Sequence, residues 1–468
     1  MVLVLTVVVL QSISFANYAL TTKTTNIIYG SAPYLTFDGG STRITNTEAL
    51  LGISLSDGRR FTPTTNNSSL ANPIELPVVG QSFNDIGMLV PTDTNSIALS
   101  SLIGTPYNYW GDDDGDGQGV NGVTATGSLN LAIIDKFRNP VARNEVPTIC
   151  DGKAPYKLTL SNTSGRLTTR YGVPNESRFT AGNATYYIHP KVSPVICSAK
   201  PNLEFSAGVY LAFPYMWSPV KGYLPQSVTP SSYDLNFPTT GAHNLYFDLL
   251  IAGTSQALSW APVSHGGITA TMTDSTSTSV RVTLTGPVAT PSQWSSDNPG
   301  QIDRLSLPQV FELVGRDSNG NAVVKYGFEL KHWFVNRGNR NVYTYSSTES
   351  WCNKIGGYRL PKVKDLTSAN CRRQVASSCE GAKPEAIYNR YWRHIGTGLF
   401  SEWGIMDYYT GANFNQNVFF WTQDRVRTRD RGGRDYLVPF MVESKMGSVK
   451  LPGNFRDTTN GYGLCVYP

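Results

Sequence analysis

Residues 345–361 read YSSTESWCNKIGGYRLP, and they open the most informative part of this 468-residue chain. Cys352 lies inside this stretch, and Cys465 lies far downstream in the segment GYGLCV. A disulfide between them would join the two ends of one domain and would contribute on the order of 4 to 5 kcal/mol in the chain-entropy model. The aromatic residues in between would supply a dense core; they are Trp351, Trp392, Phe400, Trp403, Phe419, Phe420 and Trp421. We therefore predict a separate C-terminal domain over residues 336–468.

The chain has six cysteines, an even number that favours disulfides in an exported protein. Their grouping predicts the pairs Cys150–Cys197, Cys352–Cys465 and Cys371–Cys379, because each pair then stays within one predicted domain. None of them belongs to a CxxC motif, and the five histidines show no HxxxH or HExxH spacing. The sequence therefore predicts no metal site built from cysteine and histidine.

The positive charge of the chain is concentrated in its C-terminal part. Residues 332–468 hold 19 Lys and Arg against 11 Asp and Glu, whereas residues 1–331 hold 20 against 23. The densest basic run, RVRTRDRGGR, carries Arg425, Arg427, Arg429, Arg431 and Arg434. It is either a solvated loop or an electrostatic contact with acidic glycans or host surfaces. We expect no nucleic-acid partner, because no zinc-finger, RNP or helix-turn-helix pattern accompanies the run.

The composition is typical of an extracellular β protein. Only 16% of the residues are charged, against roughly 25% in typical soluble chains. Thr, Ser, Asn, Gly and Tyr are plentiful, as expected for strands joined by tight turns. This balance argues against a helix-rich cytosolic enzyme, a coiled coil and a disordered acidic tail.

Upstream of the C-terminal domain, the sequence alternates as β-strands do. Runs of this kind cover residues 245–251, 267–272, 279–284, 309–314 and 323–330. Their spacing is typical of an immunoglobulin-like sandwich, which we place at residues 221–335 with Trp260 as its core tryptophan. The preceding stretch, residues 217–241, is rich in Pro, Ser, Gly and Tyr and is predicted to be a domain boundary.

The N-terminal half is predicted to be β-rich throughout. We expect a region of short strands over residues 17–110 and a β-sandwich-like domain over residues 111–220. The first residues, MVLVLTVVVLQSISFA, form an apolar run followed by small residues, which predicts a signal peptide at residues 1–16. No other run approaches the roughly 20 apolar residues of a membrane helix. We therefore expect no transmembrane span and a location outside the cell or on a bacterial cell surface.

An acidic loop is the one candidate cofactor site. Asp112, Asp114 and Asp116 alternate before Gly117, as the ligands at the front of a calcium loop do. Val123 stands where an EF-hand has its bidentate Glu, so the loop is not an EF-hand. It is either a structural calcium site or a solvated acidic turn, and we expect no other cofactor.

The GxGxxG pattern at residues 117–122 is no dinucleotide fingerprint, because a β-type run follows it.

The C-terminal region resembles a C-type-lectin-like domain. The resemblance is carried, in chain order, by GYRLP at 357–361, FSEWG at 400–404, FFWT at 419–422, YLVPFMV at 436–442 and GYGLCV at 461–466. The C-terminal region is most similar to the tip of intimin- and invasin-type bacterial adhesins, which also place an Ig-like domain directly before the tip. The resemblance therefore implies a mainly β protein, with tandem β-sandwich domains followed by an α+β lectin-like head. The EPN, QPD and WND strings of calcium-dependent sugar-binding lectins do not occur.

These observations predict an exported, non-enzymatic adhesin-like protein. Its head would contact a host-cell surface protein or glycan receptor, with the five arginines as the first candidates for the contact. One alternative is a lectin that binds carbohydrate by aromatic stacking without calcium. Another is an enzyme of the formylglycine-generating type, whose fold is also lectin-like and which needs reactive cysteines. Oxidised cysteines would favour the adhesin, and a free pair would favour the enzyme.

Overall fold

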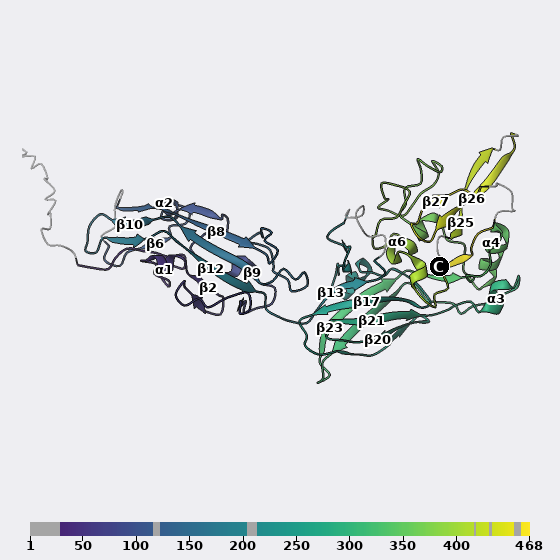
Figure 1. Cartoon of the computed structure of the whole chain (residues 1–468), viewed down its shortest axis with the longest axis horizontal. Helices are drawn as coiled ribbons and strands as arrows, with labels where there is room; N and C mark the ends of the chain where they lie inside the picture. The colour runs from purple at the N-terminus through teal and green to yellow at the C-terminus, as the bar shows by residue number, and fades with distance from the viewer. Residues whose placement is uncertain (1–28, 116–121, 204–212, 416–417, 430–432, 454–459) are drawn as a thin grey trace, which may run out of the picture. The chain divides into compact units, whose positions relative to one another are not determined.

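The computed structural model describes residues 29–115, 122–203, 213–415, 418–429, 433–453 and 460–468 (Figure 1). The predicted signal peptide at residues 1–16 lies outside these ranges. The chain divides into two compact units. The N-terminal unit comprises the described residues up to 191 except 149–151, and the C-terminal unit comprises residues 149–151 together with the described residues from 192 onward. No described helix is long and apolar enough to cross a membrane.

The N-terminal unit is built on a five-stranded sheet of order β4-β12-β9-β8-β5. A three-stranded sheet, β11-β10-β7, contributes to the same core through Ala125, Leu167 and Phe179. Burial alternates along the long strands, as expected where one face of a sheet is covered. The strands of both sheets are β4 (Ile74–Glu75), β5 (Ser96–Ala98), β7 (Val123–Thr126), β8 (Ser128–Ile134), β9 (Tyr156–Asn162), β10 (Gly165–Thr169), β11 (Glu176–Phe179) and β12 (Gly182–His189).

Short elements complete this unit. They are β1 (Tyr34–Leu35) paired with β6 (Trp110–Gly111), β2 (Ile53–Ser54) paired with β3 (Arg60–Phe61), the helices α1 (Thr47–Leu50) and α2 (Leu99–Leu102), and the 3₁₀ turn η1 (Phe83–Asp85). One hydrophobic cluster runs from Leu35 to Ile188. The structure thus places residues 29–110, expected as a separate region, in the same unit as the sandwich that follows, because short strands bury too little surface alone.

The C-terminal unit begins with an antiparallel sandwich. Its larger sheet has the order β14-β15-β13-β17-β21-β20-β19, and its smaller sheet is β18-β22-β23. The five strand runs expected from alternation correspond to β17 (Leu245–Ala252), β20 (Ile268–Thr273), β21 (Ser279–Thr285), β22 (Gln309–Arg316) and β23 (Ala322–Leu330). The others are β13 (Val195–Lys200), β14 (Trp217–Ser218), β15 (Gly222–Tyr223), β18 (Ser259–Trp260) and β19 (Val263–His265).

The predicted boundary at residues 217–241 is part of the fold. It holds β14, β15, η2 (Pro230–Leu235) and the start of β16 (Thr240–Ala242), and the sandwich already starts at β13. Its aromatic residues Trp217, Tyr223 and Phe237 are fully buried, so its prolines and glycines shape turns and do not form a linker. Trp260, the predicted core tryptophan, is only half-buried, whereas Trp333 of β24 (His332–Asn336) is fully buried.

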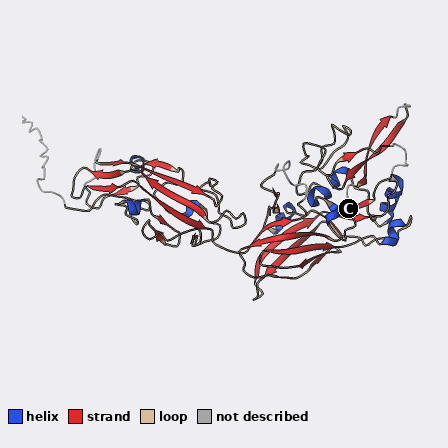
Figure 2. Cartoon of the chain, in the orientation of Figure 1, coloured by secondary structure: helices blue, strands red, loops and turns tan. Residues whose placement is uncertain are grey.

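The rest of the unit mixes short helices with small sheets (Figure 2). β24 pairs with β16 in parallel and with β28 (Leu464–Tyr467) in antiparallel orientation, which joins the sandwich to the last described strand. A second sheet is formed by β25 (Phe419–Arg429), β26 (Asp435–Glu443) and β27 (Val449–Lys450). The helical elements are α3 (Pro291–Ser295), α4 (Tyr345–Lys354), α5 (Val363–Leu366), α6 (Leu399–Trp403) and η3 (Met406–Tyr408).

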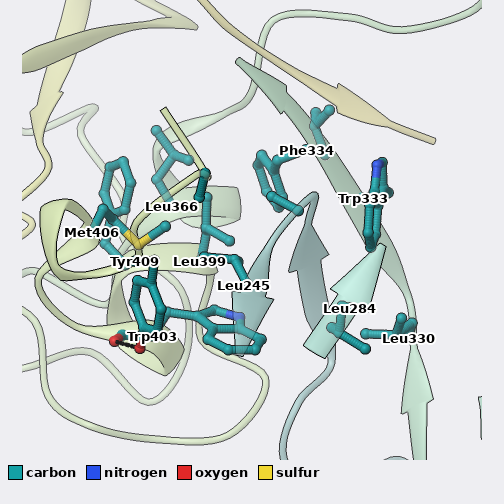
Figure 3. Packing of buried hydrophobic residues seen from close by; sticks show 14 of the residues in the cluster. Leu245, Leu284, Leu330, Trp333, Phe334, Leu366, Leu399, Trp403, Met406 and Tyr409 are labelled. Carbon is teal, nitrogen blue, oxygen red and sulfur yellow. Dashed lines mark hydrogen bonds between the residues drawn. The ribbon is translucent and has the colours of Figure 1, made fainter. Parts of the chain in front are cut away.

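A single hydrophobic core extends through the sandwich and the C-terminal region. Figure 3 shows part of it, where Leu245 and Leu284 of the sandwich belong to the same cluster as Trp403 of α6. The expected domains 221–335 and 336–468 therefore share their buried surface. The prediction of a mainly β protein, with sandwiches followed by an α+β region, is confirmed.

All three predicted disulfides are confirmed. The Cα atoms lie 5.2 Å apart in Cys150–Cys197, 5.4 Å apart in Cys352–Cys465 and 5.7 Å apart in Cys371–Cys379. Cys352 lies on α4 and Cys465 on β28, so the second bond joins the first helix of the C-terminal region to its last strand. None of the six cysteines, all of which lie in described residues, is free.

Candidate functional site

Strands β25 and β26 form a long hairpin whose two halves differ in burial. Near its base, Phe420, Trp421 and Thr422 are buried in the core, together with Phe440 and Val442 of the partner strand. Beyond a register irregularity between Trp421 and Arg425, pairing resumes from Arg425↔Pro439 to Arg429↔Asp435. This outer half extends away from the rest of the unit (Figure 1). The base therefore anchors an exposed two-stranded ribbon.

Arginines occupy one side of this ribbon. Arg425, Arg427 and Arg429 alternate with Val426 and Thr428 along β25, and all three arginines are exposed. Successive side chains of a strand point to opposite faces, so the three arginines share one face. Three of the five predicted contact residues thus lie on a strand and not in a loop. The alternation of Arg with β-branched residues is the sequence signal that indicates this strand.

The remaining two predicted arginines lie beyond β25. Arg434 is exposed just before β26, and Arg431 lies outside the described residues. The sequence gives no signal for a fourth exposed residue beside these arginines. Leu437 of β26 pairs directly with Arg427 and is 56% exposed. We call Arg425, Arg427, Arg429 and Leu437 the arginine face. It combines positive charge with an exposed apolar side chain.

Arg425 is held in place by helix α4. Its Nη2 donates to the Tyr345 hydroxyl at 2.7 Å and to Glu349 Oε1 at 2.9 Å, and its guanidinium lies 4.5 Å from the centre of the Tyr345 ring. Burial raises the pKa of Tyr345 to about 12, so its hydroxyl stays protonated and donates to Glu349 at 2.7 Å. This network fixes the base of the arginine face, and the charge of Arg425 is largely compensated.

The two outer arginines differ in their partners. Arg429 forms a two-bond ion pair with Asp435 across the hairpin, at 2.8 and 3.3 Å, with both side chains about two-thirds exposed. Such exposed pairs contribute little to stability and exchange readily. Arg427 makes no ion pair with any residue that the structure describes. It is therefore the arginine of this face that is best placed for an outside anion.

Two of the motif strings behind the lectin-like resemblance, FSEWG and GYRLP, have structural roles. Glu402 of FSEWG is fully buried, and its carboxylate accepts hydrogen bonds from five donor groups on Thr239, Thr240 and Gly396. Arg359 of GYRLP donates to Asp365 at 2.6 Å. The Glu402 contacts hold the C-terminal region to the segment that leaves the sandwich, whereas the Arg359–Asp365 pair lies within the C-terminal region.

The acidic loop is described only in part. Asp113 pairs with Arg43, and Asp114 Oδ2 accepts the Ser31 N–H at 2.8 Å. Asp114 Oδ1 is buried and has no hydrogen-bond partner among the described residues. Asp116 lies outside them. Within the described ranges, no three His, Cys, Asp or Glu side chains are placed to hold a metal ion. A calcium site at Asp112, Asp114 and Asp116 stays a prediction.

Comparison with known proteins returns distant structures only. No protein-family model and no curated protein matches the chain. A crystal structure of invasin, a bacterial integrin-binding protein, is 12% identical with a TM-score of 0.34. The match covers 75% of this chain and 52% of the invasin chain, so this chain spans about half of the invasin structure.

Two intimin structures are also similar. The C-terminal 282-residue fragment of intimin, in complex with the intimin-binding domain of the translocated intimin receptor, is 11% identical. Its TM-score is 0.31, and the match covers 74% of this chain and 93% of that one. An EHEC O157:H7 intimin mutant is 13% identical with a TM-score of 0.29 and coverages of 54% and 93%.

Proposed function

We propose that this chain is an exported bacterial adhesin-like protein that binds a protein on a host-cell surface through its arginine face. The single observation that carries the proposal is the exposed ribbon that presents Arg427 beside Leu437. Interface centres are enriched in arginine, and Arg427 presents a guanidinium that makes no ion pair with the described residues. The sequence resemblance to intimin- and invasin-type tips supports the same class of function.

A rigid base makes the ribbon suitable for recognition. Arg425 is fixed by Tyr345 and Glu349, and the base of the hairpin is buried in the core. Preorganised groups lose little conformational entropy when they bind, so more of the contact energy remains as affinity. The exposed Arg429–Asp435 pair can open to engage a partner carboxylate.

Binding of the purified chain to cultured host cells tests the proposal. Arg427→Glu and Leu437→Ala should each reduce binding by roughly tenfold, in the range of an interface residue whose loss costs more than 1 kcal/mol. Arg316→Glu is a matched control, because Arg316 is an exposed arginine of β22 in the same unit. Equal binding by Arg427→Glu and the control would refute the role of the arginine face.

Treatment of the target cells separates a protein receptor from a glycan. Protease treatment should abolish binding, whereas removal of surface glycans should leave most of it. Binding that survives protease but is lost with the glycans would favour the carbohydrate-binding alternative. Deletion of residues 336–468 is a poor test, because it would expose the core shared with the sandwich.

A further inference from the structure

A separate pocket lies in the C-terminal unit, between the sandwich and the segments around α5 and α6. It has a volume of about 300 Å³, at the lower end of the range for small-molecule sites. Its walls include Lys331 and His332 at the start of β24, Lys364 on α5, and Lys383 and Gly398 in the loops that follow. None of these residues belongs to the arginine face.

The charge of this pocket is positive. Three lysines line it, and Asp365 is the acidic residue of its wall. Asp365 is buried, and its Oδ2 accepts from Arg359 Nη1 at 2.6 Å and from the Lys362 N–H at 2.8 Å. Since Arg359 already compensates this carboxylate, Asp365 does not neutralise the lysines of the wall.

The lysines are available to a ligand. Lys364 is exposed and forms no ion pair with the residues that the structure describes. Lys331 Nζ lies 3.6 Å from Asp234, and Lys383 Nζ lies 3.3 Å from Glu385 and 3.5 Å from Glu380. Both lysine side chains are exposed and their ion pairs are long, so a ligand that carries its own negative charge can compete with the carboxylates.

His332 adds a polar ring to the wall of the pocket. Its Nδ1 is buried and has no hydrogen-bond partner in the described part of the chain. A neutral imidazole has one N–H donor and one acceptor nitrogen, so the ring can complement a ligand that carries oxygen atoms.

The buried carboxylate of Glu402 lies behind the wall of the pocket and does not compete with a ligand for the lysines and His332. Glu402 is fully buried and does not line the pocket, because Thr239, Thr240 and Gly396 surround its oxygens. We propose that the pocket binds a small molecule with a carboxylate, sulfate or phosphate group, held by Lys331, Lys364, Lys383 and His332. This site goes beyond the proposed adhesive function, since it uses other residues and another class of ligand.

Calorimetric titration of the full chain tests the site. The probes are sodium sulfate, sodium phosphate, glucuronate and uncharged glucose, at constant ionic strength set with sodium chloride. We expect at least one of the three anions to bind with one-to-one stoichiometry, and glucose to show no binding. Saturation by glucuronate alone would identify a carboxylate ligand, and saturation by sulfate or phosphate would identify an ester of those acids.

Variants locate the binding. Lys364→Ala and Lys383→Ala should each weaken binding of the active anion by about fivefold or more, as expected for loss of a charge-assisted contact. Lys325→Ala is the matched control, because Lys325 is an exposed lysine of β23 elsewhere in the same unit. Affinities equal to the control, or no anion bound more tightly than chloride, would overturn the proposal. Arg427→Glu should leave anion binding unchanged, so the test of this pocket is independent of the test of cell adhesion.

Discussion

Glu402 and Thr240 are joined by two hydrogen bonds to one carboxylate oxygen, from the Thr240 N–H at 2.9 Å and from its hydroxyl at 2.6 Å. Glu402 lies on α6 and Thr240 on β16, so this contact connects the C-terminal region to the strand that leaves the sandwich. Trp403, the next residue, donates from Nε1 to the Thr240 carbonyl at 3.0 Å. This contact between α6 and β16 is polar and lies within an apolar core.

Glu402→Gln is expected to destabilise the C-terminal unit by about 3 kcal/mol, because an amide nitrogen would face donors that now meet an oxygen. Chemical denaturation monitored by tryptophan fluorescence measures this change. Glu329→Gln is a suitable control, because Glu329 is a half-buried glutamate of β23. Equal stability of the two variants would contradict the role of Glu402.

The penalty of Glu402→Gln should depend on pH. Burial raises the pKa of Glu402 above its ordinary value of 4.5. The folded state therefore holds this proton more tightly than the unfolded state, and the contribution of Glu402 to stability falls as pH rises from about 4.5 through the raised pKa. Glutamine does not titrate, so the stability difference between the two proteins should be larger at pH 4 than at pH 7. A difference that grows with pH would contradict this assignment.

The disulfides should differ in their effect on stability. The bond Cys352–Cys465 spans 113 residues and Cys371–Cys379 spans 8. In the chain-entropy model these loops correspond to about 5 and about 2.5 kcal/mol. We expect the double variant Cys352→Ala/Cys465→Ala to lose more unfolding free energy than Cys371→Ala/Cys379→Ala. The reverse order in parallel denaturant titrations would show that native-state contacts, and not loop length, dominate.

Removal of the Tyr345 hydroxyl should loosen the arginine face without unfolding the unit. Tyr345→Phe keeps the ring, which packs edge-on against Trp421 with ring centres 5.8 Å apart, but loses the hydroxyl between Arg425 and Glu349. We expect a cost of about 1 kcal/mol. Hydrogen exchange should become faster in residues 423–429. Tyr343→Phe is the control, because the Tyr343 hydroxyl donates to the Trp294 carbonyl and its removal deletes a hydroxyl elsewhere in the same unit.

Calcium is predicted to stabilise the N-terminal unit through the acidic loop. The buried, unpartnered Oδ1 of Asp114 is an oxygen that a cation would satisfy. Addition of calcium should raise the midpoint of thermal unfolding, with reversal by a chelator and loss of the effect in Asp114→Asn. Asp57→Asn, in an exposed turn of the same unit, serves as the control. An unchanged midpoint in the unaltered protein would identify the loop as a solvated turn.

Much of the local structure follows from the sequence alone, because it depends on short-range physics. Alternating apolar residues place strands such as β17 and β23, and the grouping of the cysteines predicts the three disulfides. The charge count locates the positive excess, and the Arg-Val-Arg-Thr-Arg alternation contains the three arginines of the arginine face. Of these inferences, only the disulfides state which segments meet in space, and they rest on the grouping of each pair within one predicted domain.

The tertiary structure decided how these pieces combine. The parallel pairing of β16 with β24 and the burial of Glu402 against Thr240 merge two predicted domains into one unit, since long-range pairing leaves no periodic signal in the chain. The same meeting of distant segments creates the lysine-lined pocket and places Leu437 opposite Arg427. The composition of residues 217–241 predicts a domain boundary, because turn residues are common to boundaries and to tightly folded segments. Only the burial of their aromatic side chains distinguishes the two.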